Sequence, residues 1–363
     1  MTNTFTILYA YRNRDPNRVR LSLLSLKKQK HINFDVVFVD YGSTAKYAEN
    51  IKEVVETFDF ATYHYIGHKG LLWNKSKALN YGITKAKTGA IFISDVDVLV
   101  APDFSEIIDS LVSLNEFTLF KIGYLPESVT SKAIENSSFK ALKPKHYGDT
   151  FGVGLFPKVA LKKVGGLDEF FHFYGSEDED LNFRLEAAGY KTNRCEANLL
   201  LHQWHERYPQ KAQENLTVMP RLSNIQRLNQ RHFLRHKETQ KFVLDKVESR
   251  KYYLHSDYEI LKNPSETLEI DNVEAKVIHV LNYELPLFEN AIVKIIIKEA
   301  AFYGSSKYRL KTALNKQTQP YLSMKEVNDL ILQKILFNYR NHNYVYQVFE
   351  DLKTIEFTID LRN

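Results

Sequence analysis

Two aspartates at the end of an apolar segment are the residues of this chain best suited to chemistry. Residues 91–94 predict a buried strand, and Asp95 and Asp97 follow it directly. Side chains two positions apart on a strand point the same way, so both carboxylates meet at the strand end where open α/β sheets bind ligands. Such a pair suits Mg²⁺ or Mn²⁺ with phosphate oxygens as further ligands. The pattern indicates an enzyme of nucleotide diphosphates; solvated loop aspartates are the alternative.

A second acidic cluster consists of the consecutive residues Glu177, Asp178, Glu179 and Asp180, at the start of a helical pattern. Acidic side chains in a first helical turn interact favourably with the helix dipole, so simple helix-end charge is one interpretation. Four consecutive acidic residues are more than a helix end requires. Closely packed carboxylates raise one another's pKa, which can produce a base that works near neutral pH. Aromatic residues precede them, Tyr174 among them, as expected where a sugar hydroxyl must be oriented.

Two histidines, His202 and His205, follow a third apolar run at residues 199–201. Imidazole is a suitable further ligand for Mn²⁺ beside carboxylates. A lone histidine is more often structural, whereas this pair favours at least one metal ligand.

The first half of the chain predicts the elements that position these residues. Alternating strands and helices indicate a mostly parallel sheet with helices on both faces. The ends of the first, second and fourth strands should then lie along one edge, which would bring Arg12, Asn13, Arg14 and Asp40 beside the two aspartates. The predicted strands are 5–11, 34–40, 61–66 and 91–94, and the predicted helices are 18–28, 44–57 and 71–86.

The second half differs in character. We expect domains at residues 1–210 and 211–363, the second a smaller α+β domain that begins with a basic helical stretch at 216–251. Residues 221–251 hold nine Lys or Arg and three acidic residues, which fits contact with an anionic membrane or acidic polymer, or a solvated helix face. Nothing there indicates nucleic-acid binding. The remaining segments predict a strand at 270–281, helices at 287–301 and 327–337, and a strand pair at 344–349 and 354–359.

Composition narrows the class of protein. Hydrophobic residues make up 44% and charged residues 26% of the chain, as in ordinary globular proteins. A single cysteine, Cys195, excludes an internal disulfide and indicates a reducing compartment. No apolar run is long enough to span a membrane, and the N-terminal residues do not have a signal-peptide pattern. We therefore expect a cytoplasmic protein, with peripheral contact at the inner membrane face through the basic stretch.

The order of the motifs resembles that of the GT-A fold glycosyltransferases. The resemblance is greatest to the β-1,4-galactosyltransferase group and its chondroitin-type and polypeptide N-acetylgalactosaminyltransferase relatives (families 2, 7 and 27), and it covers residues 4–208. It rests on Tyr11-Arg12-Asn13-Arg14, Asp40 before Gly42-Ser43, Trp73-Asn74-Lys75-Ser76-Lys77-Ala78-Leu79-Asn80-Tyr81-Gly82, Asp95-Val96-Asp97, Phe151-Gly152 to Gly165-Gly166-Leu167, and Gly175-Ser176-Glu177-Asp178-Glu179-Asp180. The implied fold is a Rossmann-like, mostly parallel sheet flanked by helices.

The resemblance implies roles around the acceptor and the donor sugar. Asp178 takes the position of the catalytic base, and Glu177 that of the residue holding the donor sugar. Glu179 and Tyr174 take the acceptor-binding positions, where the family has aspartate and tryptophan.

The resemblance also implies a nucleotide and metal site. Asp97 corresponds to the metal ligand, with Asp95 beside the ribose and diphosphate; His205 fits the metal histidine and His202 is the alternative. The implied ion is Mn²⁺ (or Mg²⁺). The segments implied to contact the uridine diphosphate contain Arg12, Asn13, Arg14, Asp40, Trp73, Asn74, Lys75 and Lys77.

The implied activity is inverting, metal-dependent transfer of a hexose or N-acetylhexosamine from a UDP-sugar to a glycan or glycolipid hydroxyl, in surface polysaccharide or glycoconjugate synthesis. Thr150 stands where the galactosyl group has tyrosine, which favours UDP-GalNAc over UDP-Gal. The lack of disulfides and of a membrane anchor resembles a bacterial member. The alternatives are a non-catalytic glycan- or nucleotide-binding module and one half of a polysaccharide polymerase.

Overall fold

The computed structural model describes residues 4–206 and 214–362, which form two compact units. The first unit contains residues 4–67, 73–206 and 226–252, and the second contains residues 68–72, 214–225 and 253–362. A single boundary at residue 210 does not describe this division. Most of the basic stretch lies in the first unit, and residues 68–72 lie in the second.

A curled, mixed sheet forms the centre of the first unit. Among the described residues its strand order is β3-β2-β1-β4-β7-β6-β9-β5, with β8 paired to β6. The strands from β3 to β4 are parallel, and β7 is antiparallel to both of its neighbours. The bounds are β1 (Phe5–Tyr11), β2 (Phe34–Tyr41), β3 (Ala61–Ile66), β4 (Ala90–Ser94), β5 (Val98–Val100), β6 (Glu116–Tyr124), β7 (His146–Pro157), β8 (Lys191–Cys195) and β9 (Leu200–His202). The four strands predicted in the first half are confirmed.

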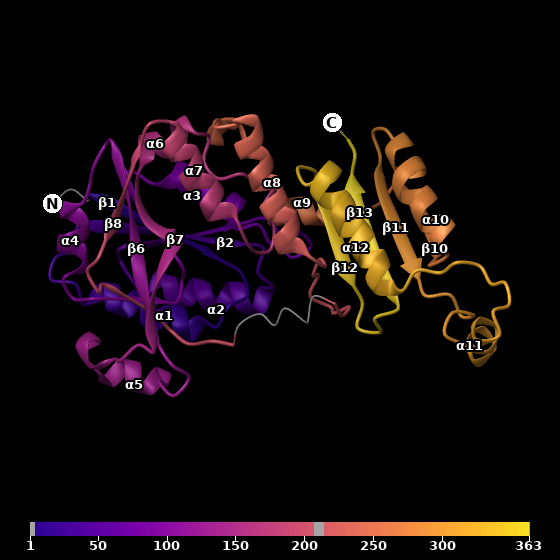
Figure 1. Cartoon of the computed structure of the whole chain (residues 1–363), viewed down its shortest axis with the longest axis horizontal. Helices are drawn as coiled ribbons and strands as arrows, with labels where there is room; N and C mark the ends of the chain where they lie inside the picture. The colour runs from indigo at the N-terminus through magenta and orange to yellow at the C-terminus, as the bar shows by residue number, and fades with distance from the viewer. Residues whose placement is uncertain (1–3, 207–213, 363) are drawn as a thin grey trace. The chain divides into compact units, whose positions relative to one another are not determined.

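Helices cover both faces of this sheet (Figure 1). The odd-numbered side chains of β1 pack in one apolar core with residues of α1, α2 and α4. On the opposite face α3 lies so close that a Cβ at Gly82 would come within 2.1 Å of Leu8 in β1. The helix bounds are α1 (Pro16–Lys27), α2 (Ala45–Glu56), α3 (Lys75–Lys85), α4 (Phe104–Ser110), α5 (Ser131–Asn136), α6 (Lys158–Lys163), α7 (Glu177–Ala187) and α8 (Ile225–Thr239).

The second unit has its own sheet, with strand order β10-β11-β13-β12 in the described part of the chain. Ile295, Ile297 and Phe357 from this sheet are fully buried, as are Val327 and Ile331 from helix α12. The bounds are α9 (His255–Ile260), β10 (Glu266–Asp271), α10 (Glu274–His279), β11 (Ile292–Lys298), α11 (Ser306–Ala313), α12 (Met324–Lys334), β12 (Tyr344–Val348) and β13 (Thr354–Asp360). The predicted helix at 327–337 and the closing strand pair are confirmed.

Two predictions for this unit were wrong. Residues 287–301 were expected to be a helix but contain strand β11, whose sequence IVKIIIK is rich in β-branched side chains that favour strands. Residues 270–281 were expected to be one strand. Instead β10 ends at Asp271 and α10 begins at Glu274, and between them the side-chain amide of Asn272 donates to the Leu322 carbonyl.

The basic stretch is also less helical than predicted. Helix α8 ends at Thr239, where Gln240 has a φ of 52° and the amide of Lys241 donates to the carbonyl of His236. This left-handed helix cap stops the helix, and only one short turn, Val247–Ser249, follows before residue 251. No helix among residues 4–206 and 214–362 has the length and apolar character needed to cross a membrane.

Candidate active site

The ends of β1, β2 and β4 meet at one edge of the first sheet, as the sequence predicted. The parallel register sets Tyr11 opposite Asp40 and Tyr9 opposite Ser94. The loops after β1 and β2 are joined by two hydrogen bonds: the Asn13 amide donates to Ser43 Oγ, and the Thr44 amide donates to Asn13 Oδ1, both at 2.9 Å. Asn13 therefore holds the two loops together.

Asp40 lies at the bottom of this edge. Its carboxylate is fully buried and accepts hydrogen bonds from the Ser43 amide and the Tyr63 hydroxyl, each at 3.0 Å. Burial raises its pKa, and Arg12 acts weakly in the opposite direction. The Ser43 and Tyr63 donors fix the orientation of the Asp40 carboxylate, and a carboxylate held in this way suits recognition of the polar edge of a nucleotide base.

Lys75 lies between the carboxylates of Asp95 and Asp178. Its Nζ lies 3.3 Å from Asp95 Oδ1 and 4.0 Å from Asp178 Oδ2. Lys75 is the main cause of the lowered pKa of Asp95, and Arg14 contributes to it. Burial raises the pKa of Asp178 to about 7 despite the opposing charge of Lys75. The pKa of Asp95 is thus lowered and that of Asp178 raised, and a carboxyl group with a pKa near 7 suits general-base chemistry.

Asp97 lies at the centre of a metal-ligand group. Its Oδ1 is 3.5 Å from His202 Nε2, and its Oδ2 is 3.5 Å from His205 Nε2. One ligand atom from each of the three lies within 4.8 Å of the others, so these donors fit a divalent cation. Burial lowers the pKa of His205, and the neutral imidazole that this favours is the form that coordinates a metal. The resemblance favoured His205, with His202 as the alternative, and the structure places both beside Asp97.

The other predicted acidic residues lie around the first turn of α7. Glu177 is buried and accepts a hydrogen bond from the Gly175 amide at 2.9 Å, whereas Glu179 is exposed and accepts one from Ser176 Oγ. Tyr174 is 67% exposed, so its ring is free to contact a ligand. Positive φ angles at Phe173, Gly175 and Ser176 shape this loop.

Two residues predicted to bind the nucleotide, Asn74 and Lys77, contact other groups of the protein. Lys77 is buried and its Nζ lies 3.6 Å from Glu169. Asn74 caps α3 by accepting from the Lys77 amide, and its own amide donates to the Glu169 carbonyl. Both residues therefore hold α3 in place. Trp73 directly before them has its ring 6.2 Å from that of Tyr41, at the end of β2.

Arg18 is a site residue that the sequence reasoning missed. Its Nη1 lies 3.6 Å from Asp97 Oδ2, is buried, and has no hydrogen-bond partner among the described residues. The sequence could have pointed to Arg18, because this residue lies in the first turn of α1, four positions after the Arg12-Asn13-Arg14 segment.

Gly152 in β7 makes room for Asp178. A Cβ at this position would lie 2.1 Å from Asp178 Oδ2 and 2.5 Å from its Cγ. We therefore expect Gly152→Ala to displace the carboxylate and reduce turnover at least tenfold, because misplacing a reacting group costs more in rate than in folding. Steady-state kinetics checks this, with Gly89→Ala as the matched control, since nothing lies within 4 Å of a Cβ there. Equal activity of the two variants would contradict it.

Comparisons with known proteins match two segments of the chain to family models. Residues 6–118 match the family model for glycosyl transferase family 2, and residues 133–207 match that described as the N-terminal domain of galactosyltransferase. Apart from residues 68–72, both matched segments lie in the first unit, whose mixed α/β sheet stands between flanking helices, and both models describe glycosyltransferase domains. No curated protein matches it.

Solved structures resemble parts of the chain. The mannosyltransferase PcManGT from Pyrobaculum calidifontis, in complex with GDP-Man and Mn²⁺, is 15% identical, with a TM-score of 0.42, over 59% of this chain and 60% of its own. S. aureus TarS 1-349 in complex with UDP is 15% identical, with a TM-score of 0.42, over 58% of this chain and 62% of its own. The chain thus spans less than two thirds of either relative.

Proposed function

We propose that this glycosyltransferase moves a sugar from a UDP-sugar to a glycan or glycolipid hydroxyl in a single inverting displacement that depends on Mn²⁺ or Mg²⁺. The observation that carries the proposal is the position of Lys75, whose Nζ lies 4.0 Å from the Asp178 carboxylate and 3.3 Å from Asp95, at the strand edge that also carries Asp97. Burial of Asp178 raises its pKa to about 7, which suits a general base.

The side chains divide the work of the reaction. Asp178 takes the proton from the acceptor hydroxyl as its oxygen attacks the anomeric carbon. Lys75 and Arg18 neutralise charge on the leaving diphosphate; the buried Nη1 of Arg18 makes no hydrogen bond among the described residues, and its ion-pair partner is Asp97, at 3.6 Å. Asp97, His202 and His205 would hold the cation, which supplies further charge neutralisation when bound. Asp40 receives the uracil edge.

An assay of sugar release and transfer from a panel of UDP-sugars, with and without Mn²⁺, tests this proposal. We expect turnover that requires the metal and one sugar transferred per event, with inverted anomeric configuration in the product. Tight nucleotide binding without any turnover would instead support the non-catalytic binding module. Alternating transfer of two different sugars would support a polymerase half.

The donor sugar is proposed to be GalNAc before galactose. Thr150 Oγ1 donates to the Phe120 carbonyl and accepts from the Val153 amide, at an irregularity in the β6–β7 register just before Gly152. A small side chain here leaves room for an acetamido group. We expect Thr150→Tyr to shift the ratio of kcat/KM for the two donors towards UDP-Gal by tenfold or more, a size typical of steric discrimination. An unchanged ratio in the variant would show that Thr150 does not set the choice.

Contact with an anionic surface is proposed for the basic stretch. The exposed face of α8 carries Arg227, Arg231, Arg235 and Lys237, although Arg231 is paired with Glu238. We expect binding to acidic liposomes that weakens between low and physiological salt, as surface electrostatic contacts do. Co-sedimentation measures it, and reversing the charge of Arg227, Arg235 and Lys237 together should abolish it. Binding that is absent or insensitive to salt would mean a solvated helix face.

A further inference from the structure

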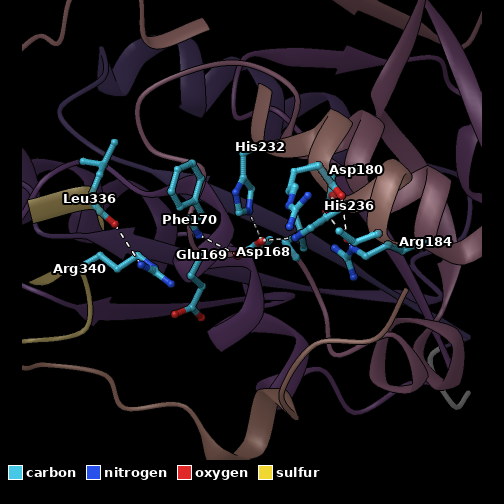
Figure 2. A network of polar contacts seen from close by, with 12 residues as sticks. Asp168, Glu169, Phe170, Asp180, Arg184, His232, His236, Leu336 and Arg340 are labelled. Carbon is cyan, nitrogen blue, oxygen red and sulfur yellow. Dashed lines mark hydrogen bonds and ion pairs between the residues drawn. The ribbon is translucent and has the colours of Figure 1, made fainter. Parts of the chain in front are cut away.

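A second group of metal-ligating side chains, which the proposed reaction does not use, lies in the first unit where α8 meets the segment before α7. His232 Nε2 lies 2.8 Å from Asp168 Oδ2, and His236 Nε2 lies 3.5 Å from the same oxygen. Figure 2 shows both imidazoles directed at Asp168. One ligand atom from each residue lies within 4.8 Å of the other two.

The spacing of these atoms suits a tetrahedral ion. With zinc–nitrogen and zinc–oxygen bonds of about 2.0–2.1 Å, the ligand atoms around tetrahedral Zn²⁺ lie roughly 3.3 Å apart. The His236–Asp168 distance of 3.5 Å is close to this value, and the His232–Asp168 distance of 2.8 Å requires only a small outward movement. Histidines four positions apart, like His232 and His236, lie on one face of a helix and are a common zinc-binding pair.

The atoms behind these ligands are already fixed by the protein. His236 Nδ1 lies 2.6 Å from Asp180 Oδ1, and Arg184 Nε donates to the other Asp180 oxygen at 2.8 Å (Figure 2). The Phe170 amide donates to Asp168 Oδ1 at 2.9 Å, and the Phe170 ring stacks on His232 with a centroid distance of 3.7 Å. A carboxylate behind a histidine and a backbone donor behind a carboxylate are the usual supports of bound zinc, because they set tautomer and orientation.

Burial differs across the group in a way that allows an ion to enter. The side chains of Asp168 and His232 are 15% and 23% exposed, whereas those of His236 and Asp180 are 3% and 0% exposed. Two of the three ligands are thus reached from the surface, whereas the third, His236, and its support Asp180 lie inside the protein. Water can complete the coordination from the exposed side.

We propose that Asp168, His232 and His236 bind one Zn²⁺-type cation that fastens α8 to the start of α7. The connection runs from His236 to Asp180, which is two residues from Asp178 in the same helix. This cation is separate from the one proposed at Asp97: its ligands are two imidazoles and one carboxylate of their own, and it needs no nucleotide.

Metal binding to the full chain without nucleotide tests the proposal. The Asp97→Ala/His205→Gln variant removes the other metal-ligand group and serves as the starting protein. We expect it to bind one equivalent of Zn²⁺ by calorimetry, to give the visible absorption of tetrahedral Co²⁺, and to melt several degrees higher with excess Zn²⁺. Adding His232→Gln should weaken binding at least 100-fold and abolish the rise in melting temperature. Adding His31→Gln, at a side chain 61% exposed, should change neither.

Two outcomes would overturn the proposal. Absence of Zn²⁺ and Co²⁺ binding in the folded starting variant would show that the group is only a hydrogen-bonded network. Binding that survives both His232→Gln and His236→Gln would place the ion elsewhere. Because His232 is partly exposed, its variant is expected to fold, which circular dichroism verifies.

Discussion

Replacing Asp178 by asparagine should lower turnover by roughly 10²-fold or more and leave donor affinity nearly unchanged. Asparagine keeps the shape that Gly152 accommodates but cannot accept the acceptor's proton. Turnover and UDP affinity, measured on the same protein, separate the two effects. Near-normal turnover would move the base role to Glu177 or Glu179. Asp109→Asn is the matched control, because Asp109 is an exposed aspartate of α4 that has no role in the proposed site.

The pH profile gives an independent reading of the same group. Burial raises the pKa of Asp178 to about 7, and the base is competent only when ionised, so kcat/KM should fall as pH drops below about 7. Lys75 favours the ionised form, so Lys75→Met should move the inflection to higher pH. Because the folded-state pKa lies above the unfolded one, ionisation of Asp178 costs stability as pH rises through 7. Asp178→Asn should therefore melt no lower than the natural protein at pH 8.

The sheet edge that carries the candidate site could be predicted because each of its strands is recognisable from a short stretch of sequence. Apolar segments that end in Arg12-Asn13-Arg14, Asp40 and Asp95 predict both the strands and the polar residues at their ends. A parallel register then leaves little freedom in where those ends meet.

Features that depend on distant contacts could not be predicted in this way. Whether a lysine of α3 points to the diphosphate or into the interior depends on packing: Lys75 reaches Asp95, and Lys77 two positions later pairs with Glu169. The need for glycine at position 152 arises from a carboxylate 26 residues away in sequence, Asp178. In α8 the sequence drew attention to the basic residues. The residues that join α8 to the rest of the first unit are instead His232, which contacts Asp168, and His236, which contacts Asp180.

Removing the cation site should have the other large effect. Chelation should abolish transfer and Mn²⁺ should restore it, and Asp97→Ala should lower turnover by roughly 10²–10³-fold, since a bound cation supplies several kcal/mol of charge stabilisation and each 1.4 kcal/mol is tenfold in rate. The fold should survive, because Arg18, the cationic neighbour of Asp97, also lies 3.6 Å from Asp15.

The controls for the cation site separate its loss from general damage. Asp109→Ala, at an exposed aspartate of α4, should leave both turnover and melting temperature unchanged. His202→Gln and His205→Gln should each raise the Mn²⁺ concentration needed for half-maximal rate, because each removes one of three protein ligands from the group around Asp97. Full activity of the natural protein in excess chelator would show that transfer does not require a metal. Full activity of Asp97→Ala would place the cation on other ligands, with Asp95 the nearest alternative along the chain.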